Sequence, residues 1–253
     1  MADSPLVLEY QGAVAYLRFN RPEVLNALNV EMADVFYDAC QSVASDSAVR
    51  VVVLSGMGRA FMAGGDLQAL RANPVPAASA LITPLHKSIM LLASMSAPVI
   101  ASVHGAAAGA GLSLMMGADL AIAAEGTKFN FAYTAIAASC DGGASWGLSR
   151  LLGLRKAMEI ALLGESFDAK EALRLGLLNR VVPAEELSDA TAEMAYRVAS
   201  YEPHALAHLK QLLRSAPVRS LEAQLQAEEH AFLDCARRPE FIKAIDDFYS
   251  NRP

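Results

Sequence analysis

Residues 105–111 consist almost wholly of glycine and alanine, reading Gly-Ala-Ala-Ala-Gly-Ala-Gly. They follow the apolar run 98–103 and precede another apolar run, 112–116. This pattern predicts a strand and a helix joined by a turn that carries almost no side chains. The backbone N–H groups of such a turn stay open to a ligand, and the helix N-terminus adds positive potential there. The segment therefore predicts a place that can hold negative charge, including charge that develops during a reaction.

Composition restricts the classes of protein to which the chain can belong. Its 253 residues are 54% hydrophobic, which predicts one large core and leaves room for buried subunit contacts. The formal net charge of −6 argues against a broad surface for nucleic acid or anionic membranes. No apolar run reaches the roughly 18 residues of a membrane span, and residues 1–5 carry no basic or apolar leader. We expect a soluble, cytoplasmic protein.

The three cysteines predict free thiols. Cys40, Cys140 and Cys235 are odd in number and far apart along the chain, so they match neither a disulfide framework nor a metal-ligand spacing. No metal site is expected.

The periodicity of apolar residues predicts strands mixed with helices up to about residue 182, and helices alone after that point. Residues 72–80, with two prolines and several alanines, predict a mobile surface loop. Strands are expected at 6–10, 14–19, 50–54, 98–103, 119–123 and 129–131, and helices at 30–45, 67–71, 81–94, 147–152, 155–163, 169–175, 185–200, 203–214, 219–235 and 239–249. The order indicates an α/β core with a helical C-terminal portion.

A second glycine turn, at 63–66, also follows a strand and precedes a helix. The N–H groups of Gly65 and Ala110, one from each turn, could point at the same oxygen atom. Two converging amides form an oxyanion hole, which stabilises an enolate or a tetrahedral adduct. The alternative is that both turns are rich in glycine only because a helix and a strand pack closely there.

Asp141 is the third candidate. It stands just before an expected helix, where capping of the helix N-terminus is the default role of an aspartate. Its neighbours in the sequence are apolar, however, and a carboxylate in an apolar pocket can act as a base or an acid. A Rossmann or P-loop site is excluded, because the glycine segment lacks the third glycine of one motif and the chain lacks the G-K-[ST] of the other.

Several segments together resemble the crotonase superfamily, also called the enoyl-CoA hydratase/isomerase family. The segments that carry the resemblance are 20–28, 59–67, 98–111, 118–123 and 167–177. The resemblance implies a crotonase-like spiral of ββα turns with a helical C-terminal trimerisation region. It divides the chain into an acyl-CoA-binding core, 1–195, and a helical portion, 196–253. It also implies an acyl-CoA thioester as substrate, no separate cofactor, and a homotrimer or hexamer.

The resemblance also assigns roles to residues. The N–H groups of Gly65 and Ala110 would hold the thioester oxygen. The residues expected to meet the CoA thioester are Leu25, Ala27, Arg59, Ala63, Gly64, Asp66, Leu67 and Tyr133. The wall of the acyl pocket is expected from Leu67, residues 72–82, Tyr133 and Trp146.

The chain departs from the family's hydratases at two positions. Ser113 and Tyr133 stand where hydratases carry two glutamates, and neither is a carboxylate base near neutral pH. Asp141 stands where some isomerases of the family, including epoxyphenylacetyl-CoA types, carry an aspartate. We therefore expect an isomerase in which Asp141 removes a proton and returns it elsewhere.

Three alternatives remain open. In 4-chlorobenzoyl-CoA dehalogenase an aspartate at the position of Asp141 is a nucleophile, with a histidine base at the position of His86. Enoyl-CoA hydratase activity is the second alternative, and a non-catalytic acyl-CoA-binding paralogue is the third.

Overall fold

A six-stranded sheet runs through the computed structural model, which describes residues 4–250. Residues 1–5, for which the sequence predicted no leader, lie partly outside the described residues. The same holds for the outermost ends of the two predicted portions, 1–195 and 196–253. The strand order is β1-β2-β3-β4-β6-β9, in which β1 pairs antiparallel with β2 and all later pairs are parallel. The strands are β1 (Leu6–Gln11), β2 (Val14–Phe19), β3 (Val51–Gly56), β4 (Val99–Val103), β6 (Leu120–Ala124) and β9 (Arg180–Val182).

Both faces of this sheet are covered, which explains why its central strands are mostly apolar. Ala15, Leu17 and Val52 point to one face and join the larger core cluster, whereas Tyr16 and Val53 point to the other face and join a smaller cluster. This alternation follows from the two-residue period of a strand. The sheet therefore separates two layers of helices.

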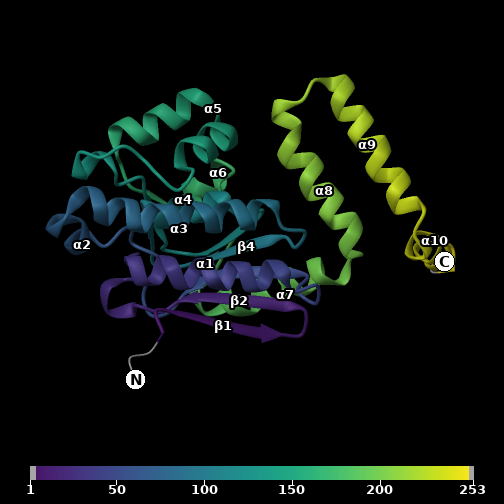
Figure 1. Ribbon diagram of the computed structural model, residues 1–253, viewed down its shortest axis with the longest axis horizontal. Coiled ribbons are helices and arrows are strands. Elements are labelled where there is room, and N and C mark those ends of the chain that lie inside the picture. Colours follow the sequence, from purple (N-terminus) through teal and green to yellow (C-terminus); the bar gives the residue numbers. More distant parts are fainter. Residues whose placement is uncertain (1–3, 251–253) are drawn as a thin grey trace.

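The helices form these layers and then leave the sheet (Figure 1). The pair α1 and α3 packs over one face, and α7 packs on the other. The helices are α1 (Val30–Ser45), α2 (Leu67–Ala72), α3 (Pro74–Ser94), α4 (Ala110–Gly117), α5 (Ala144–Leu163), α6 (Ala169–Arg174), α7 (Leu187–Ser200), α8 (Pro203–Ser215), α9 (Leu221–Ala236) and α10 (Pro239–Ser250). The predicted division at residue 195 falls inside α7.

A second, three-stranded sheet has the order β5-β7-β8. Its strands are β5 (Ala106–Ala108), β7 (Lys128–Asn130) and β8 (Phe167–Asp168). Strand β5 lies inside the glycine–alanine segment, which the sequence analysis treated as a turn alone. Ala107 is 0% exposed, and Ala106 and Ala108 are partly buried. Their small side chains allow a short strand to pass through the core.

Two further sequence predictions are changed by the structure. The loop predicted at 72–80 is wrong, because α3 begins at Pro74 and includes this segment. Prolines are tolerated in the first helical turn, where the N–H group has no partner within the helix. The helices predicted at 147–152 and 155–163 belong to α5, whose backbone breaks at Gly153 with φ 73° and ψ 160°.

Helix α8 is fastened to the sheet by a buried cation. The Lys210 ammonium is 3.0 Å from Asp119 Oδ2 and donates to the carbonyl oxygens of Leu92 and Ala97. Arg214 pairs with the other oxygen of the same carboxylate. Burial lowers the pKa of Lys210, while the charge of Asp119 acts in the opposite direction. These contacts hold α8 against the residues that directly precede β4 and β6.

Helix α3 is long and apolar enough to cross a membrane, as judged by length and composition among the described residues. In this structure it packs on α1 and buries Leu81, Leu85 and Leu92 in the core. A core helix of a globular protein passes the same test, so the property carries no argument for a span.

We predict that Gly111→Ala destabilises the fold and that Gly117→Ala, in the same helix, does not. A Cβ at Gly111 would lie 2.2 Å from the Met62 carbonyl oxygen, whereas one at Gly117 meets nothing within 4 Å. Overpacking of this kind costs about 1–3 kcal/mol or more, against at most about 1 kcal/mol gained from alanine in a helix. Urea denaturation of the two variants measures the difference, and equal midpoints would contradict the account.

Candidate active site

The two glycine turns lie side by side at the carboxyl ends of β3 and β4. The chain at 61–62 runs parallel to 104–108, where Phe61 N donates to His104 O at 2.8 Å and Ala108 N donates to Met62 O at 3.0 Å. A Cβ at Gly111 would collide with Met62 O, so glycine is required for this close approach. Close packing thus requires glycine at position 111, directly after Ala110, whose amide is one of the two predicted oxyanion-hole donors.

The amides of Gly65 and Ala110 are free. Neither N–H donates a hydrogen bond to any residue from 4 to 250, although the neighbouring amides of Asp66 and Gly109 are paired, with Leu28 O and Asn130 O. Ala110 is the first residue of α4, after Gly109 at the N-cap with φ 49° and ψ −116°. Its N–H is thus one of the unpaired donors at a helix N-terminus.

Gly65 and Ala110 both line a cavity of about 260 Å³. Seven of the predicted site residues line it, namely Ala63, Gly64, Gly65, Leu67, Ala110, Tyr133 and Asp141. Its remaining lining residues are mostly apolar: Leu70, Ala78, Leu81, Ile82, Gly109, Ala132, Ile136, Ala138, Ser139 and Cys140. An apolar cavity with a few converging polar groups is the usual form of a small-molecule site.

Asp141 is held by the hydroxyl of Tyr133. Tyr133 Oη donates to Asp141 Oδ1 at 2.6 Å, and Ser113 Oγ lies 3.1 Å from the same hydroxyl. Asp141 Oδ2 makes no hydrogen bond to a described residue, and Asp141 is one of the residues that line the cavity. The Ser113 hydroxyl also donates back to Gly109 O at 3.1 Å.

Tyr133 remains a hydrogen-bond donor at neutral pH. The ring is 8% exposed, and burial first, then the charge of Asp141, raises the pKa of Tyr133 above its usual value. A protonated phenol donates its only hydrogen to the carboxylate, so it orients Asp141 and cannot itself accept a proton.

The helix-cap alternative for Asp141 is wrong. The N-cap of α5 is Gly143, and no side chain caps this helix. The carbonyl of Asp141 accepts from Ala144 N at 3.0 Å, which leaves the carboxylate free to turn toward Tyr133. Two consecutive glycines with positive φ, Gly142 and Gly143, allow the chain to make this bend.

His86 is occupied by a backbone contact. Its Nε2 accepts from Gly142 N at 3.1 Å, and its ring does not line the cavity. This contact could not be predicted from the sequence, because His86 and Gly142 are far apart in the chain.

An ion pair and a buried amide hold the loop before the first glycine turn. Arg21 pairs with Asp66 at 3.1 Å, and Asp66 also caps α2. Asn26 is 0% exposed and donates to the carbonyl oxygens of Met57 and Ala60. The side chain of Asp66 is thus used within the protein, and its backbone N–H and carbonyl are paired with Leu28 O and Leu70 N.

Four predicted binding residues do not line the cavity: Leu25, Ala27, Arg59 and Asp66. Leu25 adjoins it through its carbonyl, which accepts from Ala63 N, while Arg59 is exposed. The prediction that Trp146 belongs to the wall is wrong. Its ring lies under the Arg150 guanidinium in a separate groove beside α8, because it faces away from the cavity at the start of α5.

Sequence reasoning missed the opposite wall of the cavity. Ile136, Ser139 and Cys140 line it from the loop between Tyr133 and Asp141. Their only signal in the sequence was their nearness to Asp141, since the loop has no regular period.

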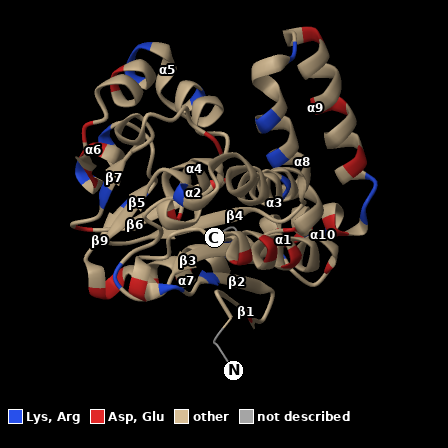
Figure 2. Ribbon diagram, turned by 60° about the vertical axis from the view of Figure 1, so that its left-hand side comes forward, with Lys and Arg blue, Asp and Glu red and all other residues tan. Residues whose placement is uncertain are grey.

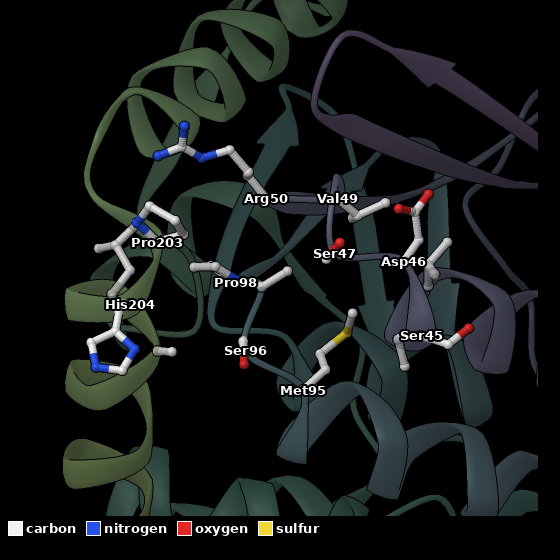
Figure 3. A pocket seen from close by; sticks show the side chains of 15 residues that line it. Ser45, Asp46, Ser47, Val49, Arg50, Met95, Ser96, Pro98, Pro203 and His204 are labelled. Carbon is white, nitrogen blue, oxygen red and sulfur yellow. The ribbon is translucent and has the colours of Figure 1, made fainter.

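A larger cavity of about 370 Å³ lies elsewhere, between the ends of α1 and α3 and the start of α8 (Figure 3). Ser45, Asp46 and Ser47 line one side, and Pro203 and His204 stand on the other. The Arg50 guanidinium extends toward α8 and donates to Tyr201 O. Neither free amide and no part of the Asp141 network opens onto this cavity.

Acidic and basic residues are interspersed over the ribbon in the view of Figure 2. Basic residues colour α8 and acidic residues colour α9.

Comparisons with known proteins show what the chain resembles over nearly its whole length. The family described as enoyl-CoA hydratase/isomerase matches residues 9–253. The chain is 33% identical over 246 residues to 1,2-epoxyphenylacetyl-CoA isomerase of Escherichia coli, covering 96% of this chain and 94% of the relative. It is also 33% identical to a probable enoyl-CoA hydratase of Rhodobacter capsulatus, covering 97% and 95%. An enoyl-CoA hydratase structure from Polaromonas superposes with a TM-score of 0.92, at 33% identity, over 98% of this chain and 97% of the other.

Proposed function

The chain belongs to the enoyl-CoA hydratase/isomerase family, and we propose that it isomerises an acyl-CoA thioester through an enolate. One observation carries the proposal. Asp141 is the one carboxylate among the described residues that line the cavity, and it shares that cavity with the free amides of Gly65 and Ala110. A base and an oxyanion hole in one apolar cavity are the groups that enolate chemistry needs.

The proton moves in two steps. The thioester oxygen accepts hydrogen bonds from Gly65 N and Ala110 N, which makes a proton on the carbon framework more acidic. Asp141 Oδ2 removes that proton, and the electron pair moves onto the thioester oxygen as an enolate. The same carboxyl group returns the proton at another carbon, so the double bond shifts and the protein ends unchanged.

Tyr133 acts in this scheme as a positioning residue. Its hydroxyl donates to Asp141 Oδ1 at 2.6 Å, which directs the other oxygen toward the substrate. Because its pKa is raised by burial, it stays a donor while Asp141 changes charge. Ser113 supports the hydroxyl from the other side.

The chemistry of the cavity favours isomerisation over hydration. Hydration must activate a water molecule as well as deliver a proton, and Ser113 and Tyr133 supply no second carboxylate for that task. A dehalogenase of the kind considered above would need a free base at His86, but His86 Nε2 accepts from Gly142 N here. The free Asp141 Oδ2 remains compatible with nucleophilic attack, so mass spectrometry of single-turnover mixtures distinguishes a covalent ester from proton transfer.

We also propose that the CoA portion follows the first glycine turn. The backbone of Ala63 and Gly64 lines the cavity, and the carbonyl of Leu25 is bonded to Ala63 N. Arg59, exposed nearby in the sequence, is available for a phosphate. The thioester is both ligand and substrate in this scheme, and no further cofactor is needed.

We predict that the protein assembles as a trimer or a pair of trimers. Large apolar side chains stay exposed on the helical portion and on α5, which marks an interaction surface. They include Leu151, Leu154, Leu162, Leu209, Leu213, Leu221, Leu225, Phe232 and Ile242. Light scattering after gel filtration should give three or six times 26.8 kDa. A monomer at micromolar concentration would contradict this prediction.

We predict that Asp141→Asn abolishes turnover while CoA-thioester binding survives. The amide keeps the size of the side chain but cannot accept a proton, so the rate of double-bond migration should fall about 10²–10⁴-fold. A panel of enoyl-CoA thioesters assayed in D₂O reports both migration and deuterium uptake, and calorimetry reports binding.

Asp38→Asn, an exposed aspartate on α1, is the matched control and should leave both readouts unchanged. Deuterium uptake that persists in Asp141→Asn would rule out Asp141 as the base. Water addition without migration in the unaltered protein would instead identify a hydratase.

A further inference from the structure

A cluster of metal-ligating side chains lies between α8 and α9, away from the cavity that holds Asp141. His204 and His208 are one turn apart on α8, so they lie on the same face of the helix. Asp234 and Cys235 come from α9, which packs beside α8 (Figure 1). None of the four side chains lines the Asp141 cavity.

Three of these groups converge on one point. His204 Nε2 and His208 Nε2 lie 2.7 and 3.0 Å from Asp234 Oδ2, and the two nitrogens are 3.2 Å apart. In a tetrahedral zinc site with metal–ligand distances of about 2.0–2.1 Å, the ligand atoms are separated by about 3.3 Å. The three atoms are thus close to the spacing of one face of such a tetrahedron, and a small outward movement would complete it.

Without a cation, both imidazoles must direct an N–H at the same carboxylate oxygen. An ion in the centre would replace the two protons and use the same three atoms as ligands.

Cys235 follows Asp234 on α9 and offers a thiol to the same two histidines, in a group of three donors that does not include the Asp234 carboxylate. A turn of the Cys235 side chain would bring the thiol to the ion as the fourth donor. The ligand atoms offered by His204, His208 and Cys235 lie within 4.8 Å of one another. A thiol that coordinates a divalent cation is deprotonated. Imidazole, carboxylate and thiolate ligands are together a donor set that suits Zn²⁺.

We propose that His204, His208, Asp234 and Cys235 form a structural Zn²⁺ site that fastens α9 to α8. Helix α8 is itself held to the sheet by Lys210 and Arg214 through Asp119. The ion would extend this attachment to the next helix of the chain. The sequence prediction of no metal site rested on the spacing of the three cysteines alone. The donors proposed here come from two helices and are mostly not cysteines. The proposal is independent of the function of the Asp141 cavity.

The test uses the full chain with any oligohistidine tag removed, since such a tag binds the same ions. The protein is stripped with EDTA, dialysed and titrated with ZnCl₂ by calorimetry. We expect one Zn²⁺ per chain and a melting temperature that rises with Zn²⁺ and falls back when EDTA is added. Co²⁺ in place of Zn²⁺ should give a thiolate charge-transfer band in the near ultraviolet.

Paired variants separate the site from adventitious binding. His208→Gln and Asp234→Asn should each lower the affinity for Zn²⁺ at least tenfold and remove the rise in melting temperature, while Cys235→Ser should remove the Co²⁺ charge-transfer band. His230→Gln on α9 and Cys140→Ser are the matched controls, because both lie outside the cluster. Circular dichroism confirms that each variant is folded.

Two results would overturn the proposal. The first is an unaltered protein that takes up no Zn²⁺, which would make the cluster a hydrogen-bonded contact only. The second is uptake that both His208→Gln and Asp234→Asn leave unchanged, which would place the ion elsewhere.

Discussion

The close approach of two backbone segments is the constraint on which the site depends. Gly111, at the start of α4, lies against the carbonyl of Met62, where a single methyl group would come within 2.2 Å of the oxygen. Hydrogen bonds between 61–62 and 104–108 fix the two segments in parallel. Because the segments are fixed, Gly65 and Ala110, whose N–H groups have no partner among residues 4–250, line one cavity and need no side chain to position them. An amide donor held by the fold costs no reorganisation when charge develops in front of it.

The carboxylate reaches the same cavity by a different route. It lies at the end of the irregular segment between β7 and α5, and its direction is set by one hydrogen bond from Tyr133 and by the glycines that follow it. Tyr133 is itself buried beside Ser113 on α4. Helix α4 thus carries the Ala110 amide and also Ser113, which contacts the tyrosine that orients Asp141. The proposed base and one of the two proposed oxyanion-hole donors therefore both depend on this helix.

The sequence predicted this arrangement unevenly. The apolar strands and most helices were evident from periodicity, and the fold followed from the resemblance of several segments. Convergence of the two turns was a hypothesis from composition, and both turns do line one cavity. The loop prediction for 72–80 was wrong because the prolines of this segment lie in the first turns of α3, where they are compatible with a helix. The prediction that Trp146 lines the cavity was wrong because nearness in sequence to Asp141 does not reveal which side of α5 faces the cavity. The four residues between α8 and α9 are separated by a helical turn and a long stretch of chain, so their contact was visible only in three dimensions.

The polarisation of the thioester carbonyl tests the central claim most directly. Infrared difference spectroscopy of a thioester labelled with ¹³C at the carbonyl, bound to Asp141→Asn so that it is not turned over, reports the hydrogen bonds that reach the oxygen. If the amides of Gly65 and Ala110 hold that oxygen, the carbonyl stretch moves to lower frequency than in water and narrows. A carbonyl stretch that is unchanged from free thioester in water would contradict the account.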